Sequence, residues 1–181
     1  TSIGRSAFYK CTKLTSVTYT GTIDGWAMIE FGDSAANLVY YAEHLYINGV
    51  DIYQQTSIAL TSATKIGSHA FSIFKNLTNI TIPNSVMSIG VSAFQDCSNL
   101  STVVISSSVN SIGSKAFSNC ENLESIVLPE GIETIKSDSF EGCKNLRNIR
   151  INGDNKIFYI NEEDGCLYER TAFGDKIVIK I

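Results

Sequence analysis

The stretch "SIGVSAFQDCSNL" at residues 88–100 returns as "SIGSKAFSNCENL" at 111–123 and, weakened, as "TIKSDSFEGCKNL" at 134–146. Equivalent positions lie 23 residues apart. One such column consists of the phenylalanines Phe71, Phe94, Phe117 and Phe140. A fixed period of this kind indicates a solenoid, a propeller or an array. Because 23 residues fit one strand and one compact turn per unit, a solenoid is predicted.

The unit "LTNITIPNSVMSIGVSAFQDCSN" at 77–99 has two parts. Ile80 and Ile82 alternate with polar residues, as in a half-buried strand, and a second short extended piece ends at Gly90. The remaining "SAFQDCSN" is too short for a stable helix, so a single helical or 3₁₀ turn is expected. Stacked coils would bury one another's apolar sides, with parallel strands about 4.8 Å apart and right-handed winding.

Two polar columns are expected to be structural. The asparagine before each repeat leucine is predicted to be buried and to satisfy turn backbone groups, which is favoured over a ligand role. These asparagines are Asn76, Asn99, Asn122 and Asn145. Gly67, Gly90 and Gly113 are expected to supply positive φ or close backbone approach. Lys136 interrupts the glycine column, which suggests that the fourth unit is drifting towards a cap.

The pattern I-G-x-x-A-F-x-x-C-x-x-L-x-x-I-x-I-P has its cleanest copies at residues 66–83 and 89–105, with a further copy at 112–129. It resembles the BspA-like branch of the leucine-rich-repeat proteins. "IGRSAFYKCTKLTSV" at 3–17 looks like another copy, and "NEEDGCLYERTAFGDKIVIKI" at 161–181 is similar to the family's D-G-x-L-Y hairpin. The predicted fold class is therefore α/β repeat: a leucine-rich-repeat-like right-handed solenoid, mostly β by content. The resemblance also implies a secreted or surface-attached protein of mucosal bacteria, often with a role in adhesion.

A single solenoid domain is expected over residues 1–181, as part of a longer chain because Thr1 falls inside a repeat. An aromatic insertion is predicted at about 19–60 and a capping hairpin at about 152–181. In "QQTSIALTSA" at 54–63, Ile58 and Leu60 lie one step out of phase with the repeat, so a bulged or displaced coil is expected there.

Composition excludes several partners. The net charge of −4 and the pI near 5.1 argue against nucleic-acid binding, and the scattered cations argue against an anionic membrane surface. The chain has no apolar run approaching the ~18 residues of a membrane span, so membrane insertion is not expected. The protein is expected to be monomeric.

The cysteines are predicted to be buried thiols rather than disulfides or metal ligands. Four of the five share one repeat position: Cys11, Cys97, Cys120 and Cys143. Phe74 takes that position once, which is typical of an apolar core site. The chain has no C-x₂₋₄-C pair for zinc, and Cys166 is also assigned to the core. No metal or other cofactor is predicted, although reduced cysteines are unusual in an extracellular protein.

Catalysis is not expected. The two histidines, His44 and His69, are far apart in sequence, and no G-x-S-x-G nucleophile elbow is present. The acidic run ending at Gly165 fails the EF-hand pattern, because Ile160 and Thr171 would take positions 1 and 12. Asp164-Gly165 is interpreted as a turn.

The candidate site is a surface. The residues predicted to point outward from the strands are Asn79, Thr81, Thr102, Val104, Ser125, Val127, Asn148 and Arg150. They form either a binding face or a merely solvated one. A second candidate is an aromatic patch in the insertion, made of Trp26, Tyr40, Tyr41 and Tyr46. The alternative, favoured for Trp26, Ile29 and Phe31, is that these residues form a small core of the insertion.

The predicted function is non-enzymatic: a cell-surface or secreted module that recognises a protein or glycan of a host or a neighbouring cell. The alternative is a structural spacer that projects another domain of a larger surface protein. A hydrolase that depends on the two histidines is the third hypothesis.

Overall fold

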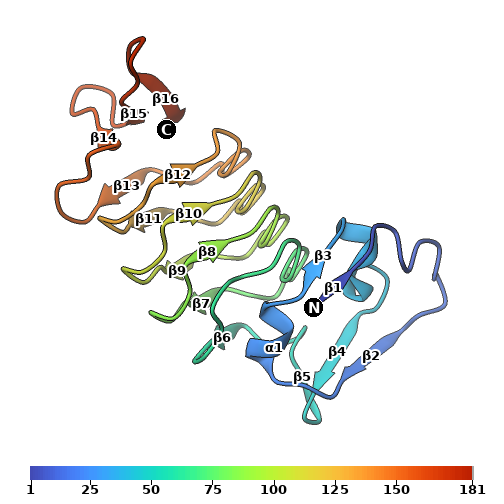
Figure 1. The fold of residues 1–181 in the computed structure, drawn as a ribbon. Helices are drawn as coiled ribbons and strands as arrows, with labels where there is room; N and C mark the ends of the chain where they lie inside the picture. Colours follow the sequence, from blue (N-terminus) through green and yellow to red (C-terminus); the bar gives the residue numbers. More distant parts are fainter. Residues whose placement is uncertain (181) are drawn as a thin grey trace.

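The computed structural model describes residues 1–180, which wind into a solenoid with two ladders of short parallel strands (Figure 1). The first ladder contains β6 (Ser57–Ala59), β7 (Asn79–Thr81), β9 (Thr102–Val104), β11 (Ser125–Leu128) and β13 (Asn148–Ile151). The second contains β8 (Ser88–Ile89), β10 (Ser111–Ile112) and β12 (Thr134–Ile135). Strands β6, β7 and β9 form one hydrogen-bonded group and β11 and β13 another, while β9 and β11 touch without pairing.

The repeated apolar residues form the core. The rings of Phe71, Phe94, Phe117 and Phe140 stack in one column, with centroids 5.5, 5.2 and 5.2 Å apart and interplanar angles of 2°, 9° and 12°. Leucines and isoleucines from both ladders pack around this column in one continuous cluster. Each coil therefore covers the apolar side of the next, as predicted from the 23-residue period. The predicted class, a leucine-rich-repeat-like solenoid with short parallel strands and little helix, is confirmed.

The "SAFQDCSN" segment is a chain of tight turns rather than a helix. Ala93 N–H, Gln95 N–H and Cys97 N–H each bond to the carbonyl three residues earlier. Ser92 and Asp96 have φ of 52° and 61°, and these left-handed residues prevent the turns from continuing as a helix. We call these turns, in all coils, the turn layer.

At the phenylalanine positions of the turn layer, backbone hydrogen bonds join the coils in one direction. Phe71 N–H donates to Ala93 O at 2.8 Å, and Phe94 N–H donates to Ala116 O at 2.8 Å. Phe117 N–H donates to Ser139 O at the same distance. Each coil thus gives N–H donors to the coil that follows it in sequence.

The glycine column serves close backbone approach and not positive φ. A Cβ on Gly90 would lie 2.6 Å from Ser68 N, and one on Gly113 would lie 2.8 Å from Gly90 C. A Cβ on Gly67 would come within 2.0 Å of Ile29 O. Side chains are excluded here because the neighbouring backbone occupies the space.

The prediction of buried asparagines is wrong. Asn99, Asn122 and Asn145 are exposed, and Asn76 is half-buried. Asn122 Nδ2 donates to Asn99 Oδ1 at 3.3 Å, so the column links coils only at the surface. Asn76 Nδ2 donates to Gln54 Oε1 at 3.0 Å and to Tyr53 O at 3.4 Å, while the turn backbone bonds mainly to itself and to neighbouring coils.

The cysteine thiols, rather than the asparagines, form the inner side-chain hydrogen bonds to the turn backbone. Cys97, Cys120 and Cys143 donate through Sγ to the carbonyls of Phe71, Phe94 and Phe117, at 3.0, 3.2 and 3.1 Å. Each bond joins a coil to the preceding one. Each of the five cysteines is a free thiol, and Cys97, Cys120 and Cys166 are buried as predicted. The prediction is wrong for Cys11, which is exposed, and Cys143 is only half-buried.

The out-of-phase coil at 54–63 is neither bulged nor displaced. Strand β6 pairs in regular register with β7, with Ser57, Ile58 and Ala59 opposite Asn79, Ile80 and Thr81. Ile58 and Leu60 are buried. The missing residue is absorbed in the connection to Ile66, because the apolar side chains fix the strand's register.

The N-terminal segment contains β1 (Ser2–Ile3), β2 (Ser16–Tyr19), α1 (Ile23–Ala27), β3 (Glu30–Phe31), η1 (Ser34–Ala36), η2 (Leu38–Tyr40), β4 (His44–Ile47) and β5 (Val50–Asp51). Strand β3 pairs parallel to β1, and β4 pairs parallel to β2 and antiparallel to β5. The segment at 19–60 is stacked into the solenoid: Phe31 N–H donates to Ser68 O at 3.0 Å. The Trp26 indole N–H donates to Ala70 O at 2.8 Å, replacing the backbone donor of a regular coil.

Asp24, on α1, fastens this segment to the connection after β6. Its side chain is buried and accepts the backbone N–H groups of Thr61, Ser62 and Ala63 at 2.8, 2.9 and 2.9 Å. Burial alone would raise the pKa of Asp24, but these hydrogen bonds hold the pKa below its ordinary value. The ionised carboxylate therefore has a structural role: it holds α1 to the connection after β6, and we call this contact the Asp24 staple.

The C-terminal end carries the antiparallel sheet of β14 (Phe158–Ile160), β15 (Leu167–Glu169) and β16 (Lys176–Ile179). The buried Asn155 donates to Glu130 O and Ile132 O, which ties the approach to this sheet to the last coil. Val178 and Ile179 are buried. The last residue of the predicted hairpin, Ile181, lies outside the described residues.

Candidate binding surface

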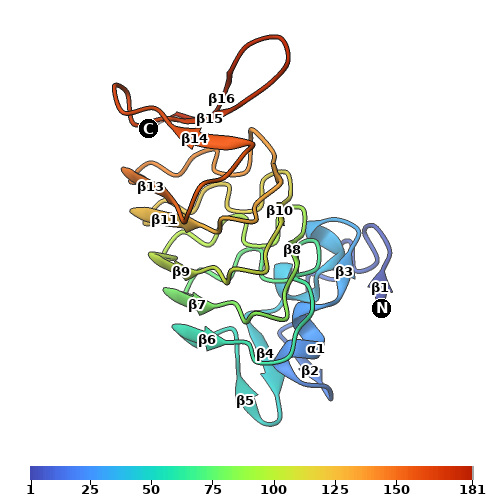
Figure 2. The ribbon, with the colours of Figure 1, turned by 60° about the vertical axis from the view of Figure 1, so that its left-hand side comes forward.

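The strands of the first ladder are stacked along one side of the molecule (Figure 2). Their outward side chains are exposed, and we call this surface the strand face. All eight residues predicted for it are exposed: Asn79, Thr81, Thr102, Val104, Ser125, Val127, Asn148 and Arg150. Within each group of paired strands the register aligns them in two columns, with Thr81 opposite Val104 and Val127 opposite Arg150. The structure therefore brings the predicted residues together; that they bind a ligand stays a prediction.

Two further residues belong to this face. Ser57 and Ala59 are exposed on β6 and lie in register with Asn79 and Thr81. Sequence reasoning missed them because it placed them at core positions of an out-of-phase repeat. The signal was present in Ile58 and Leu60, which by alternation define the inward side of the strand.

A hollow of about 320 Å³ lies over β11 and β13 on this face. Its lining residues are Ser125, Ile126, Val127, Asn148 and Arg150. Four of these five are predicted strand-face residues. The hollow offers a hydroxyl, an amide and a guanidinium beside the methyl groups of Val127, so it can accept both hydrogen-bond acceptors and aliphatic groups.

This part of the face carries two arginines, Arg147 and Arg150, that have no ion-pair partner among residues 1–180. Among residues 1–180, no carboxylate lies within 4.0 Å of the Arg147 or Arg150 guanidinium, and neither side chain makes a hydrogen bond. Glu124 is exposed nearby at the start of β11, and its carbonyl accepts Arg147 N–H at 3.0 Å. By contrast, Arg170 is engaged with Asn155 O and Phe158 O at 3.0 and 3.2 Å.

The four predicted patch aromatics do not form one surface. Trp26 is 1 % exposed and packs against Tyr19 and Phe31, so its assignment to an exposed patch is wrong. The alternative core assignment for Trp26, Ile29 and Phe31 is confirmed, because all three are buried. The indole fills the space that a regular coil's own side chains would fill.

The remaining patch residues separate into two places. Tyr40 is exposed and meets Tyr41 edge to face at 5.1 Å, while the Tyr41 hydroxyl accepts Lys10 N–H at 3.1 Å. Tyr46 lies on β4, opposite Thr18 of β2, and stacks on His44 at 6.0 Å. The aromatic surface is thus a tyrosine pair beside the first turn layer plus a half-buried ring on a strand.

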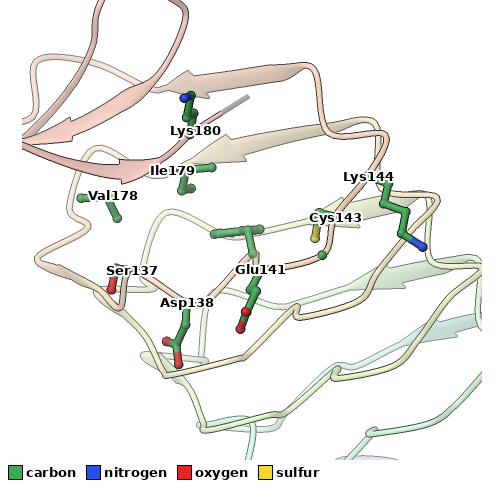
Figure 3. A pocket seen from close by; sticks show the side chains of 10 residues that line it. Ser137, Asp138, Glu141, Cys143, Lys144, Val178, Ile179 and Lys180 are labelled. Carbon is green, nitrogen blue, oxygen red and sulfur yellow. The ribbon is translucent and has the colours of Figure 1, made fainter.

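A second hollow, of about 480 Å³, lies between the last turn layer and β16 (Figure 3). Figure 3 shows Asp138 and Glu141 on the turn side, with Val178 and Ile179 across from them. Asp138 is already engaged by Ser114 Oγ at 2.7 Å and by Lys115 N–H at 3.3 Å. This hollow marks the end of the coil-to-coil hydrogen bonding, and its charged side chains do not converge on one point.

The groups considered for catalysis lie apart. His44 Nδ1 is 2.5 Å from Asp51 Oδ2 on the neighbouring strand β5. His69 is half-buried in the turn layer; burial lowers its pKa, opposed by the charge of Asp33. The described residues contain no group of three or more His, Cys, Asp or Glu side chains that could hold a metal ion.

The thiols of Cys97, Cys120 and Cys143 have low reactivity. Burial raises the pKa of Cys97 and Cys120 far above the ordinary thiol value, and it raises the pKa of Cys143 to about 11. The reactive thiolate is therefore scarce at neutral pH. These cysteines serve packing and hydrogen bonding.

Sequence and structure comparisons place this fold among bacterial leucine-rich-repeat proteins. The family described as BspA type leucine rich repeat region matches residues 1–44 and 50–166, with six copies. No curated protein sequence matches the chain. The chain belongs to the BspA-type leucine-rich-repeat family.

Several solved bacterial structures are similar to this chain. The pneumococcal vaccine antigen PcpA is 25 % identical with a TM-score of 0.53, over 86 % of this chain and 40 % of that one. A leucine-rich repeat protein from Bacteroides ovatus is 33 % identical with a TM-score of 0.50, over 52 % and 25 %. A leucine rich cell surface protein from Faecalibacterium prausnitzii is 28 % identical with a TM-score of 0.42, over 56 % and 33 %.

The matched region is 25 % to 40 % of the length of these three proteins. The chain therefore spans less than half the length of each of these solved structures. Within residues 1–180, no helix is long and apolar enough to cross a membrane.

Proposed function

We propose that this region is a non-enzymatic binding module of a secreted or cell-surface protein and that it recognises a protein or glycan partner through the strand face. The observation that carries the proposal is the hollow over β11 and β13, lined by four residues of that face. Solenoids bind partners along such extended surfaces.

The composition of the face supports recognition. Val104 and Val127 are 52 % and 42 % exposed, and Arg150 lies beside Val127 without an ion-pair partner among residues 1–180. Exposed aliphatic groups next to an unpaired arginine are typical of the contact regions of protein interfaces.

The second candidate is a structural spacer that projects another domain of a larger surface protein. The unbroken phenylalanine column and the thiol bonds between coils support it, because they make a stiff rod of uniform cross-section. A spacer needs no ligand, which separates it experimentally from a binding module.

The test is binding to an array of host matrix proteins and glycans. Wild type is compared with Val127→Glu on the strand face and with Thr134→Glu, a matched exposed strand position on β12. A hit lost in the first variant and kept in the second supports the strand face. A hit lost instead in Tyr40→Ala transfers recognition to the tyrosine pair, and an array without any hit favours the spacer.

Point substitutions are used because a larger replacement, such as one of residues 21–44, would disturb the core. That segment holds Trp26 and Phe31 in the core and the Asp24 staple. Its removal would unfold the N-terminal coils, so a loss of binding would carry no information about the surface.

A further inference from the structure

The hollow over β11 and β13 has the donors of an anion site. Arg150 contributes a planar guanidinium, Asn148 an amide and Ser125 a hydroxyl, all on adjacent strands in regular register. The guanidinium fork matches a carboxylate in a two-pronged hydrogen-bonded pair. A volume of about 320 Å³ admits a side chain rather than a large cofactor.

No carboxylate of the described chain uses this fork. Arg150 has no ion pair among residues 1–180, whereas Lys144 pairs with Glu121 at 2.7 Å and Lys65 with Glu30 at 2.5 Å. Asn148 and Ser125 likewise make no side-chain hydrogen bond within residues 1–180. The three donors are therefore available to an incoming acceptor.

The surroundings of the hollow favour a polypeptide over a saccharide. Val127 lines it, and Val104 lies on the next strand of the stack; both are exposed. Strands β9, β11 and β13 contain no aromatic residue on which a sugar ring could stack. Aliphatic methyl groups next to an arginine fit a peptide that carries an aliphatic and an acidic side chain.

We propose that this hollow binds the carboxylate of an acidic side chain in an extended polypeptide, with an aliphatic neighbour of that side chain lying on Val127 and Val104. The proposal rests on the strand face being the binding surface and names the chemistry that it recognises. Arg150 pairs with the carboxylate, and Asn148 and Ser125 donate to its remaining lone pairs.

The experiment is a titration followed by NMR, using the arginine Nε–Hε signals and the Val127 amide. The probes are the peptide acetyl-Ser-Val-Ser-Glu-Val-Ser-amide, its Glu→Gln counterpart, and a hyaluronan hexasaccharide. We expect saturable shifts at Arg150 with the Glu peptide and at least fivefold weaker binding of the Gln peptide. Arg150→Gln should abolish the shifts.

Arg147→Gln is the matched control, because Arg147 is also exposed, directly before β13, but does not line the hollow. Equal weakening by both substitutions would overturn the inference in favour of general charge attraction. Binding of the hyaluronan alone would overturn it in favour of an acidic glycan, and an absence of shifts with every probe would overturn it outright. An array hit lost in Val127→Glu but kept in Arg150→Gln would leave the proposed function standing and refute only the carboxylate site.

Discussion

Truncating the middle of the phenylalanine column should cost more than truncating its end. Phe117 is fully buried and stacks on two rings, Phe94 and Phe140, each at 5.2 Å. Phe117→Ala should lower the free energy of unfolding by about 4–5 kcal/mol, the upper part of the range for buried phenylalanines. Phe140 is 6 % exposed and has one ring partner in the column, so Phe140→Ala should cost about 1 kcal/mol less, the value of one aromatic pair.

Phe8 provides the lower reference, because it occupies the same repeat position in the first coil but is only half-buried. Phe8→Ala should cost about 1–1.5 kcal/mol, roughly half of a full side-chain burial. Without the ring column, these three truncations would differ only by their residual exposure.

Urea unfolding, followed by far-ultraviolet circular dichroism and by the fluorescence of Trp26, measures all three. The single tryptophan reports on the N-terminal coils, so coincident transitions test whether the solenoid unfolds as one unit. A cost for Phe140→Ala equal to or greater than that for Phe117→Ala, at unchanged m-value, would refute the stacking argument.

Three further predictions follow from the coil contacts. Gly90→Ala should reduce the denaturation midpoint sharply, because its Cβ would lie 2.6 Å from backbone, while Gly131→Ala, with its nearest atom at 3.7 Å, should leave the midpoint nearly unchanged. In the native protein at pH 8, Ellman's reagent should modify the exposed Cys11 quickly and Cys143 only upon unfolding; rapid reaction of more than one thiol would contradict the buried ladder. Because its folded pKa is lowered, Asp24 contributes its full stabilisation above its unfolded pKa of about 4, and this contribution is lost progressively as the pH falls from that value through the lower folded pKa. The stability difference between wild type and Asp24→Asn should therefore shrink from pH 6 to pH 3, and a constant difference would count against the staple.

The regular coils were predictable from sequence because the 23-residue period is itself a packing constraint. Ile89, Phe94 and Cys97 recur since each must lie on its counterpart, so their burial can be read without coordinates. The asparagine column misled for a related reason. Constant spacing shows that a position stacks, but an exposed stack and a buried one repeat equally well.

The irregular segment was less predictable, because its contacts depend on pairs that no period reports. Nothing in the sequence links Trp26 to the carbonyl of Ala70 or Asp24 to the amides after β6. The hollow at Arg150 also could not be predicted from the sequence, because the sequence does not show which charged side chains form ion pairs in the folded protein. The strand face itself was predictable, because alternation along a strand determines which side faces outward.

The backbone hydrogen bonding at the phenylalanine positions gives each coil two different faces. One face presents N–H donors to the next coil, and the other presents carbonyl acceptors to the coil before it. The amides of Phe71, Phe94 and Phe117 each meet a carbonyl of the coil that follows in sequence. A gene duplication or deletion that spans whole 23-residue units therefore places donors opposite acceptors at the new junction and leaves every other junction unchanged. A change of any other length must be absorbed in a connection, as the stretch before Ile66 does, or it ends the array. The rod can thus vary in length over evolution while the chemistry displayed on each strand varies separately.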